Sequence, residues 1–274
     1  YTGRTEIISC KNAYHGSTQG SASLMSSETY TSSFRPLLPG ITHIEFNNFD
    51  DIELITKDVA CVIIEPIQAE AGIILPVNGY LQAIRKKCTE TGTLLIFDEI
   101  QTGFGKTGQL FAFQKYGVVP DVLLLGKAMG GGMPLAAFIS SQQIMSSLSH
   151  DPILGHITTF GGHPVNCAAG LATLRVITET RLIEQINEKS ALLVKNLKHP
   201  IIKEIRHAGL MMAIDLGNNA LVMKTIEYCL ANGLITDWFL FNDISLRICP
   251  PLTITNAEIL KACEILNSAF DCCT

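Results

Sequence analysis

The chain has 274 residues, of which 47% are hydrophobic and 16% are charged, and its formal net charge is −5. This length supports a sizeable hydrophobic core, and one large domain with a smaller one is expected. The mildly acidic balance and the few aromatic residues give no electrostatic reason to expect nucleic acid as a partner. The apolar runs are far too short to cross a bilayer and suit buried parallel strands instead, so no membrane partner is predicted.

Nine cysteines are scattered along the chain, and none of them form a Cys-x-x-Cys pair. An odd number of cysteines spread over apolar segments is typical of reduced thiols, whereas a secreted disulfide framework is disfavoured at this size. The first residues do not read as a secretory leader, and no metal-ligand set is predicted. A cytoplasmic location is therefore expected.

Hydrophobic periodicity predicts the elements of the first two-thirds of the chain. An amphipathic helix is expected over 79–92, "GYLQAIRKKCTETG", with Gly92 as its C-cap. Strand–helix alternation favours a mainly parallel sheet with helices on both faces. The expected strands are "TEIISC" (5–10), "ACVIIEP" (60–66), "TLLIFDE" (93–99), "DVLLLG" (121–126) and "LAAFISS" (135–141).

The pattern changes in the last third of the chain. Residues 163–197 predict one long helical stretch, which is followed by several shorter elements. A helix is expected near 219–232, and a final helix from about Asn256. We place a domain boundary near residue 178, so that residues 1–178 form the large domain and residues 179–274 the small one.

Residues 94–109, "LLIFDEIQTGFGKTGQ", combine two features of nucleotide-binding proteins. An apolar strand ends in an Asp-Glu pair, as in a Walker B element, and a Gly-Lys-Thr triplet begins at Gly105. A Walker A loop needs another glycine five residues before that one, so that backbone N–H groups can wrap the phosphates. This position is Ile100, and the loop follows the acidic strand instead of preceding it. The spacing therefore argues against an NTPase.

The acidic residue at the end of this strand still needs an explanation. Asp98 lies at its carboxyl end, where open α/β sheets bind ligands, although it could simply cap a helix. A second strand ends in Lys127 within "PDVLLLGKAMGGGMP". A lysine there is costly to bury unless it is functional, and desolvation frees its amine for Schiff-base chemistry. A carboxylate and a lysine on neighbouring strands describe a pyridoxal 5′-phosphate (PLP) site, but a lysine that merely extends to solvent fits the spacing equally well.

Six segments, in this order, match a known family: "AYHGST" (13–18), "IIEPIQAEAG" (63–72), "LLIFDEIQTGFGKTG" (94–108), "PDVLLLGKAMGGGMPLAAF" (120–138), "TTFGGHPVNCAA" (158–169) and "LRICPPLTIT" (246–255). The chain resembles the class III PLP-dependent aminotransferases of fold type I, and within them the acetylornithine/ornithine aminotransferase branch. The resemblance implies an α/β fold. A mostly parallel sheet would form the large PLP-binding domain, residues 1–178, with a smaller C-terminal α/β domain at residues 179–274.

The resemblance also implies which residues hold the cofactor. Lys127 resembles the catalytic Schiff-base lysine, and Asp98 resembles the carboxylate that pairs with the pyridinium nitrogen. Gln101 resembles the residue that hydrogen-bonds the ring 3′-oxygen. Tyr14 resembles the aromatic residue that stacks on the cofactor ring, and His15 and Gly16 complete its loop.

The resemblance implies a phosphate site that this chain holds only in part. Thr159 resembles the threonine that reaches the cofactor phosphate of a neighbouring subunit, so a homodimer with the active site at its interface is expected. Family members carry roughly a hundred residues ahead of the point that corresponds to Tyr1. These include a Ser-Gly-Thr loop that cradles the phosphate at a helix N-terminus. The opening "YTGRTEIISC" reads as the middle of a fold, so a longer parent protein is expected.

Three further residues are assigned to the substrates by the resemblance. Arg247 resembles the arginine that clamps the substrate α-carboxylate, a bidentate task that suits a guanidinium. Glu70 resembles the glutamate that pairs with this arginine when no α-carboxylate is present, and Glu65 is expected near the site. The expected reaction transfers the ω-amino group of an ornithine-like or N-acylornithine-like donor to 2-oxoglutarate by a ping-pong mechanism. Another class III reaction (decarboxylase, aminomutase or racemase) and an inactive, dimerising fragment remain alternatives.

Overall fold

The computed structural model describes residues 1–273. Within it the chain forms two compact units. The first comprises Tyr1–Pro66, Pro76–Phe104 and Phe111–Val176. The second comprises Ile67–Leu75, Gly105–Leu110 and the residues from Ile177 onward. Two short segments of the N-terminal half thus belong to the second unit. The assignment of 1–178 as a cofactor domain and 179–274 as a small domain stays a prediction.

The first unit is built on a sheet that has six strands within the described residues, in the order β2-β1-β3-β4-β5-β6. Strands β1 to β5 pair in parallel, and β6 runs antiparallel to β5. This confirms the mostly parallel α/β fold. The strands are β1 (Glu6–Cys10), β2 (Ile41–Ile44), β3 (Val59–Ile64), β4 (Leu94–Asp98), β5 (Val122–Leu125) and β6 (Ala137–Ser140).

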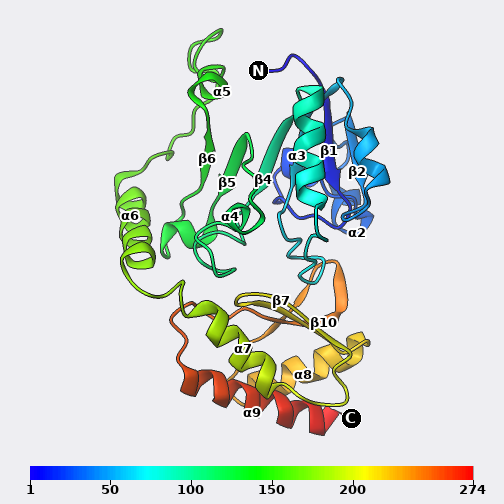
Figure 1. Ribbon diagram of the computed structural model, residues 1–274, viewed down its shortest axis with the longest axis vertical. Helices are drawn as coiled ribbons and strands as arrows, with labels where there is room; N and C mark the ends of the chain where they lie inside the picture. Colours follow the sequence, from blue (N-terminus) through cyan, green and yellow to red (C-terminus); the bar gives the residue numbers. More distant parts are fainter. Residues whose placement is uncertain (274) are drawn as a thin grey trace. The chain divides into compact units, whose positions relative to one another are not determined.

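The longest helix that lies wholly in the first unit is α3 (Tyr80–Thr91), which runs alongside the strands in Figure 1. It buries Leu81, Ile84 and Cys88 at helical spacing, and Gly92 follows with φ 67°, so the predicted helix and its C-cap are confirmed. The shorter helices of this unit are α1 (Gln19–Ser23), α2 (Glu28–Thr31), α4 (Ala112–Tyr116), α5 (Gln142–Ser146) and the 3₁₀ turns η1 (Ser32–Phe34), η2 (Asp50–Leu54) and η3 (Lys127–Gly130).

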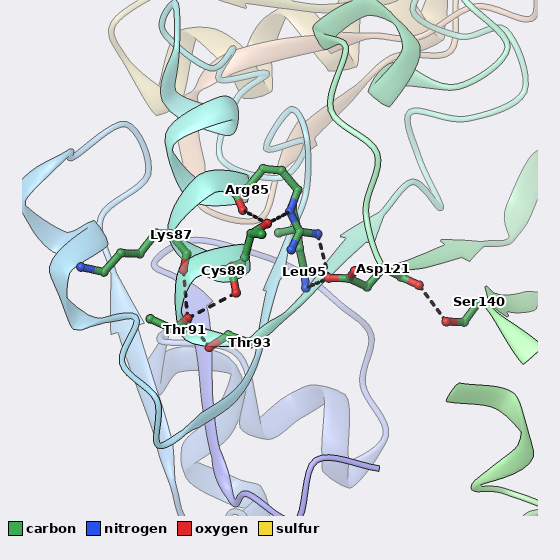
Figure 2. A network of polar contacts seen from close by, with 9 residues as sticks. Arg85, Lys87, Cys88, Thr91, Thr93, Leu95, Asp121 and Ser140 are labelled. Atoms are coloured by element: carbon green, nitrogen blue, oxygen red, sulfur yellow. Dashed lines mark hydrogen bonds and ion pairs between the residues drawn. The ribbon is translucent and has the colours of Figure 1, made fainter. Parts of the chain in front are cut away.

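Figure 2 shows a polar network around Asp121, the residue that precedes β5. One carboxylate oxygen of Asp121 accepts hydrogen bonds from Arg85 Nη1 of α3 and from the Leu95 N–H of β4, each at 2.7 Å. Its carbonyl accepts from the Ser140 hydroxyl of β6 at 2.7 Å. A single residue therefore ties α3, β4 and β6 together at the start of β5.

The second unit carries an antiparallel sheet with four strands among the described residues, in the order β7-β8-β10-β9. Its helices lie together beside this sheet in Figure 1, and their apolar faces form one core with side chains such as Met212, Leu246 and Phe270. The elements are β7 (Glu204–Ala208), β8 (Met211–Asp215), β9 (Asp237–Phe239), β10 (Asn242–Ile248), α7 (Ile186–Asn196), α8 (Asn219–Ala231) and α9 (Asn256–Cys273).

The predicted single long helix over 163–197 is wrong. The structure has α6 (Pro164–Glu179) and α7, and the residues between them form turns. The N–H groups of Gln185 and Ile186 donate to the carbonyls of Leu182 and Ile183, three residues back, in place of the bonding of an α-helix. Ile183 still packs against the backbone of Gly105, so the apolar periodicity continues across the break and conceals it.

None of the helices within residues 1–273 has both the length and the apolar character that a membrane crossing requires.

Candidate active site

The candidate cofactor residues of the first unit gather at one edge of its sheet. Asp98 ends β4 and pairs in register with Leu124 of the neighbouring parallel strand, three residues before Lys127. The segment that contains Tyr14 follows β1, and Glu65 follows β3. Because these strands are parallel, their carboxyl ends lie at the same edge, which is where open α/β sheets bind ligands.

Asp98 is held in place by two hydrogen bonds. One carboxylate oxygen lies 2.8 Å from Nδ1 of His15, and the other accepts from the Ile100 N–H at 3.0 Å. The side chain of Asp98 is only 4% exposed, and that of His15 only 2%. An ionised carboxylate can only accept, so Nδ1 is the donor. The Nε2 atom of His15 is buried and has no partner within residues 1–273. His15 therefore orients the carboxylate and presents a vacant hydrogen-bonding atom beside it.

Glu65 holds the loop that carries the candidate stacking residue. The Tyr14 N–H donates to a carboxylate oxygen of Glu65 at 3.3 Å, across the ends of β1 and β3. Glu65 is buried, and Tyr14 is half-buried. Gly16, two residues on, has φ 118°, a conformation that side chains rarely adopt. The loop at 13–16 is thus tied to Glu65 at the end of β3, and the substrate role expected for Glu65 stays a prediction.

Lys127 differs from the expectation that it ends a buried strand. β5 ends at Leu125, and Lys127 begins the 3₁₀ turn η3 with φ 46° and an exposed side chain. The turn places Lys127 outside the buried strand. Desolvation by burial therefore does not explain a reactive amine within this chain. Gln101 is half-buried in the turn after β4, and Thr159 is exposed between α5 and α6. Their cofactor roles stay predictions.

Glu99, the second acidic residue after β4, has a structural role that sequence reasoning did not find. It is fully buried, and its carboxylate accepts from the N–H groups of Ala112 and Phe113 at 2.6 and 2.7 Å. The Thr102 hydroxyl donates to it at 3.1 Å. Burial raises the pKa of Glu99 above its ordinary value, although these three donors act to lower it. The carboxylate thus caps the start of α4 and ties it to the end of β4.

Removing this cap is expected to destabilise the protein. Glu99→Ala leaves the N–H groups of Ala112 and Phe113 and the Thr102 hydroxyl without their acceptor, which costs about 2–4 kcal/mol of unfolding free energy. Urea denaturation followed by circular dichroism measures this loss. Glu90→Ala, at an exposed position of α3, serves as the control and is expected to stay within about 0.5 kcal/mol of the parent protein. Equal stability of the two variants would contradict the capping role.

The Gly-Lys-Thr triplet also has a structural explanation. Lys106 Nζ donates to the Pro250 carbonyl at 2.6 Å, and the Lys106 carbonyl accepts from the Leu210 N–H at 3.0 Å. A Cβ atom on Gly209 would lie 2.5 Å from that carbonyl. Segment 105–110 is therefore packed into the second unit beside β10, and its lysine is engaged by backbone carbonyls.

Two of the three candidate substrate residues, Arg247 and Glu70, lie together in the second unit, whereas Glu65 lies in the first. Arg247 of β10 forms an ion pair with Glu70 at 2.7 Å between Nη1 and Oε1. Glu70 is buried, and its other carboxylate oxygen accepts from the Leu240 N–H at 3.2 Å. Two residues far apart in the sequence thus meet, as the resemblance implied they would.

The segment that carries Glu70 is anchored to the small sheet by its backbone. The carbonyl of Glu70 accepts from the Phe241 N–H at 3.0 Å, and that of Gly72 accepts from Arg206 Nε at 2.8 Å. Gly72 has φ 98°, and a Cβ atom there would lie 2.6 Å from Asn242 Nδ2. The positive φ favours glycine here, and the two hydrogen bonds to backbone carbonyls hold the segment that carries Glu70.

Arg247 has a second acidic partner, Asp237, which sequence reasoning missed. Its Nη2 lies 3.1 Å from Oδ2 of Asp237, and its guanidinium carbon lies 5.3 Å from the centre of the Phe239 ring. Burial alone would lower the pKa of Arg247, but Glu70 and then Asp237 outweigh it, so the pKa is raised. The register of β9 and β10 pairs these two residues directly, and this pairing is the signal that could have revealed Asp237.

The model of the family described as aminotransferase class-III matches residues 1–270 of this chain. The chain belongs to the class-III aminotransferase family. Two solved ornithine aminotransferases of parasites are similar to it. That of Toxoplasma gondii has 31% identity and a TM-score of 0.91, and the match covers 98% of this chain and 65% of that one. That of Plasmodium falciparum has 29% identity and a TM-score of 0.82, and the match covers 98% of this chain and 65% of that one.

An amine transaminase of the same fold is also similar. The enzyme comes from an uncultivated Pseudomonas species and was solved in its PLP-bound form. It has 27% identity and a TM-score of 0.89, and the match covers 99% of this chain and 70% of that one. The chain therefore spans about two thirds of the length of these family members.

Proposed function

We propose that the protein is a PLP-dependent aminotransferase that moves the ω-amino group of an ornithine-like or N-acylornithine-like donor to 2-oxoglutarate. The observation that carries the proposal is the Arg247–Glu70 ion pair. A keto acid such as 2-oxoglutarate bears a carboxylate next to its reacting carbon, and a bidentate arginine binds that group well. An ω-amino donor has no carboxylate there, so Glu70 neutralises the arginine during that half of the reaction. One site can then serve both substrates in turn.

The residues at the sheet edge of the first unit fit PLP. Bound PLP withdraws electrons from the carbon that bears the transferred amino group. The Asp98 carboxylate, oriented by His15, suits a protonated pyridine nitrogen, because a buried and ionised acceptor stabilises a cation opposite it. Lys127 supplies the amine that attaches the cofactor, and it then moves the proton at the carbon that bears the amino group.

The remaining cofactor contacts follow from the positions of the other site residues. Tyr14 is held by Glu65 at the end of β1 and is assigned to stack on the cofactor ring. Gly16 continues that loop, and Gln101 in the turn after β4 is assigned to the ring 3′-oxygen. These assignments require the cofactor to lie against the carboxyl ends of β1, β3, β4 and β5.

A homodimer is part of the proposal, with Thr159 reaching the phosphate of the partner's cofactor. Large apolar side chains gather at exposed positions around this threonine and along α6, and patches of this kind mark protein interfaces. They are Ile153, Leu154, Ile157, Phe160, Val165, Leu171 and Val176. Burial of such a patch between two subunits would place Thr159 at the interface.

The experiment that tests the proposal supplies the PLP-saturated, full-length protein with 2-oxoglutarate and one amine at a time. Ornithine, N-acetylornithine and 4-aminobutyrate form the panel, and glutamate is measured by mass spectrometry. We expect glutamate with at least one of these ω-amines. Release of carbon dioxide, or an isomerised or racemised amine without glutamate, would support another class III reaction instead. If none of the three amines reacts, the result would support a non-catalytic, dimerising role.

A further inference from the structure

We propose that Asp237 is a specificity-determining residue, a second counter-ion that competes with the substrate carboxylate for Arg247. The inference rests on the proposed function, in which Arg247 binds the carboxylate next to the reacting carbon of the keto acid. Asp237 acts through Arg247 and takes no part in the chemical step.

The geometry divides the guanidinium between two carboxylates. Nη1 of Arg247 is bound to Glu70 at 2.7 Å, and Nη2 is bound to Asp237 at 3.1 Å. A guanidinium binds a carboxylate most tightly through two parallel N–H donors. An incoming substrate carboxylate that is to be held in this way must therefore displace Asp237 as well as Glu70.

The two carboxylates are held in different ways. Glu70 is only 6% exposed in its side chain and also accepts from the Leu240 N–H, on a segment whose carbonyls are bound to the small sheet. Asp237 is 51% exposed, lies at the edge of that sheet on β9, and accepts from the Trp238 N–H at 2.8 Å through its other carboxylate oxygen. Its side chain can leave Arg247 for water at little cost, because exposed ion pairs are weak.

The support around Arg247 keeps it in place when Asp237 leaves. Its guanidinium lies over the buried ring of Phe239, and its carbonyl accepts from the Thr236 hydroxyl at 2.6 Å. A pocket of about 320 Å³ in the second unit is lined by Arg247 and Asp237 among others. Asp237 thus weakens carboxylate binding without setting the position of the arginine.

The test compares Asp237→Asn with Asp243→Asn, which removes the same charge from an exposed position on β10. Asp237→Glu is the conservative variant that keeps the pair. The two half-reactions of the PLP-loaded, full-length protein are followed separately by the cofactor absorbance, with ornithine and then with 2-oxoglutarate. Binding of glutarate, an unreactive dicarboxylate, is measured by calorimetry.

Asp237→Asn is expected to tighten binding of 2-oxoglutarate and of glutarate about two- to fivefold, the range set by an exposed ion pair. The half-reaction with ornithine, which brings no carboxylate next to the reacting amine, is expected to keep its apparent affinity and rate. Asp243→Asn and Asp237→Glu are expected to match the parent protein in every measurement.

Three results would overturn the inference. In the first, Asp237→Asn binds glutarate with the same affinity as Asp243→Asn. In the second, Asp237→Asn changes the apparent affinity of the ornithine and the 2-oxoglutarate half-reactions equally. The third is a parent protein that reacts with ornithine but does not bind glutarate. A parent protein that binds glutarate but transfers no amino group would refute the proposed function alone, and the glutarate comparison would still decide the role of Asp237. Asp237→Ser replaces Asp237→Asn if the latter does not fold.

Discussion

Lys127→Ala is expected to lower the rate of transamination by about three orders of magnitude or more, because it removes both the attachment amine and the proton-transfer group. Proton transfer alone contributes about 10²- to 10⁴-fold in enzymes. Single-turnover kinetics with ornithine as donor and saturating PLP measures the loss, and circular dichroism checks the fold. Lys127 is exposed, so the substitution removes no core packing and folding is expected to be retained.

The matched control is Lys86→Ala, an exposed lysine on α3 that is remote from the sheet edge. It is expected to keep the parent rate. Addition of a small primary amine such as methylamine is expected to restore part of the lost rate in Lys127→Ala, because the missing group is an amine. A Lys127→Ala protein with more than about a hundredth of the parent rate would contradict the general-base role, which requires at least a 10²-fold loss.

Asp98→Asn is expected to lower kcat by about 10²- to 10³-fold, the effect of removing one preorganised electrostatic partner from a reacting group. The amide keeps the shape of the carboxylate and can still accept from His15, but it no longer carries the charge that stabilises a protonated pyridine nitrogen. The loss is expected in kcat for both half-reactions, because both depend on the same electron withdrawal.

The control for this variant is Asp58→Asn, which removes a carboxylate at an exposed position ahead of β3. Its kcat is expected to equal that of the parent protein. If Asp98→Asn also kept the parent kcat, the carboxylate would do no more than accept hydrogen bonds from the Ile100 N–H and from His15.

The apolar runs of the first unit were predictable from sequence, whereas two short edge strands, β2 and β9, were not. β3, β4 and β5 have no exposed position and read as nearly continuous hydrophobic stretches. β2 and β9 lie at sheet edges and have 4 and 3 residues, too few to show an alternating pattern. The break between α6 and α7 was missed because Ile183 packs inward at helical spacing within a turn.

The site residues divide in a similar way. Asp98 was predicted from a strand end and both Asp98 and Lys127 from the family motifs, whereas β5 ends two residues before Lys127. The capping role of Glu99 depends on α4, thirteen residues further along, and the role of Asp237 depends on the pairing of β9 with β10. Such contacts are set by tertiary structure and leave no local pattern. The exposure of Lys127 likewise follows from the 3₁₀ turn that β5 enters.

The most direct test of this account is to reduce the PLP-saturated protein with borohydride, digest it with trypsin and map the phosphopyridoxyl group by mass spectrometry. Reduction fixes the cofactor to the amine that attaches it. The account predicts the label on Lys127, in the peptide that contains "AMGGGMPLAAF". A label on another lysine, such as Lys106, or no label on a protein that transaminates, would contradict it.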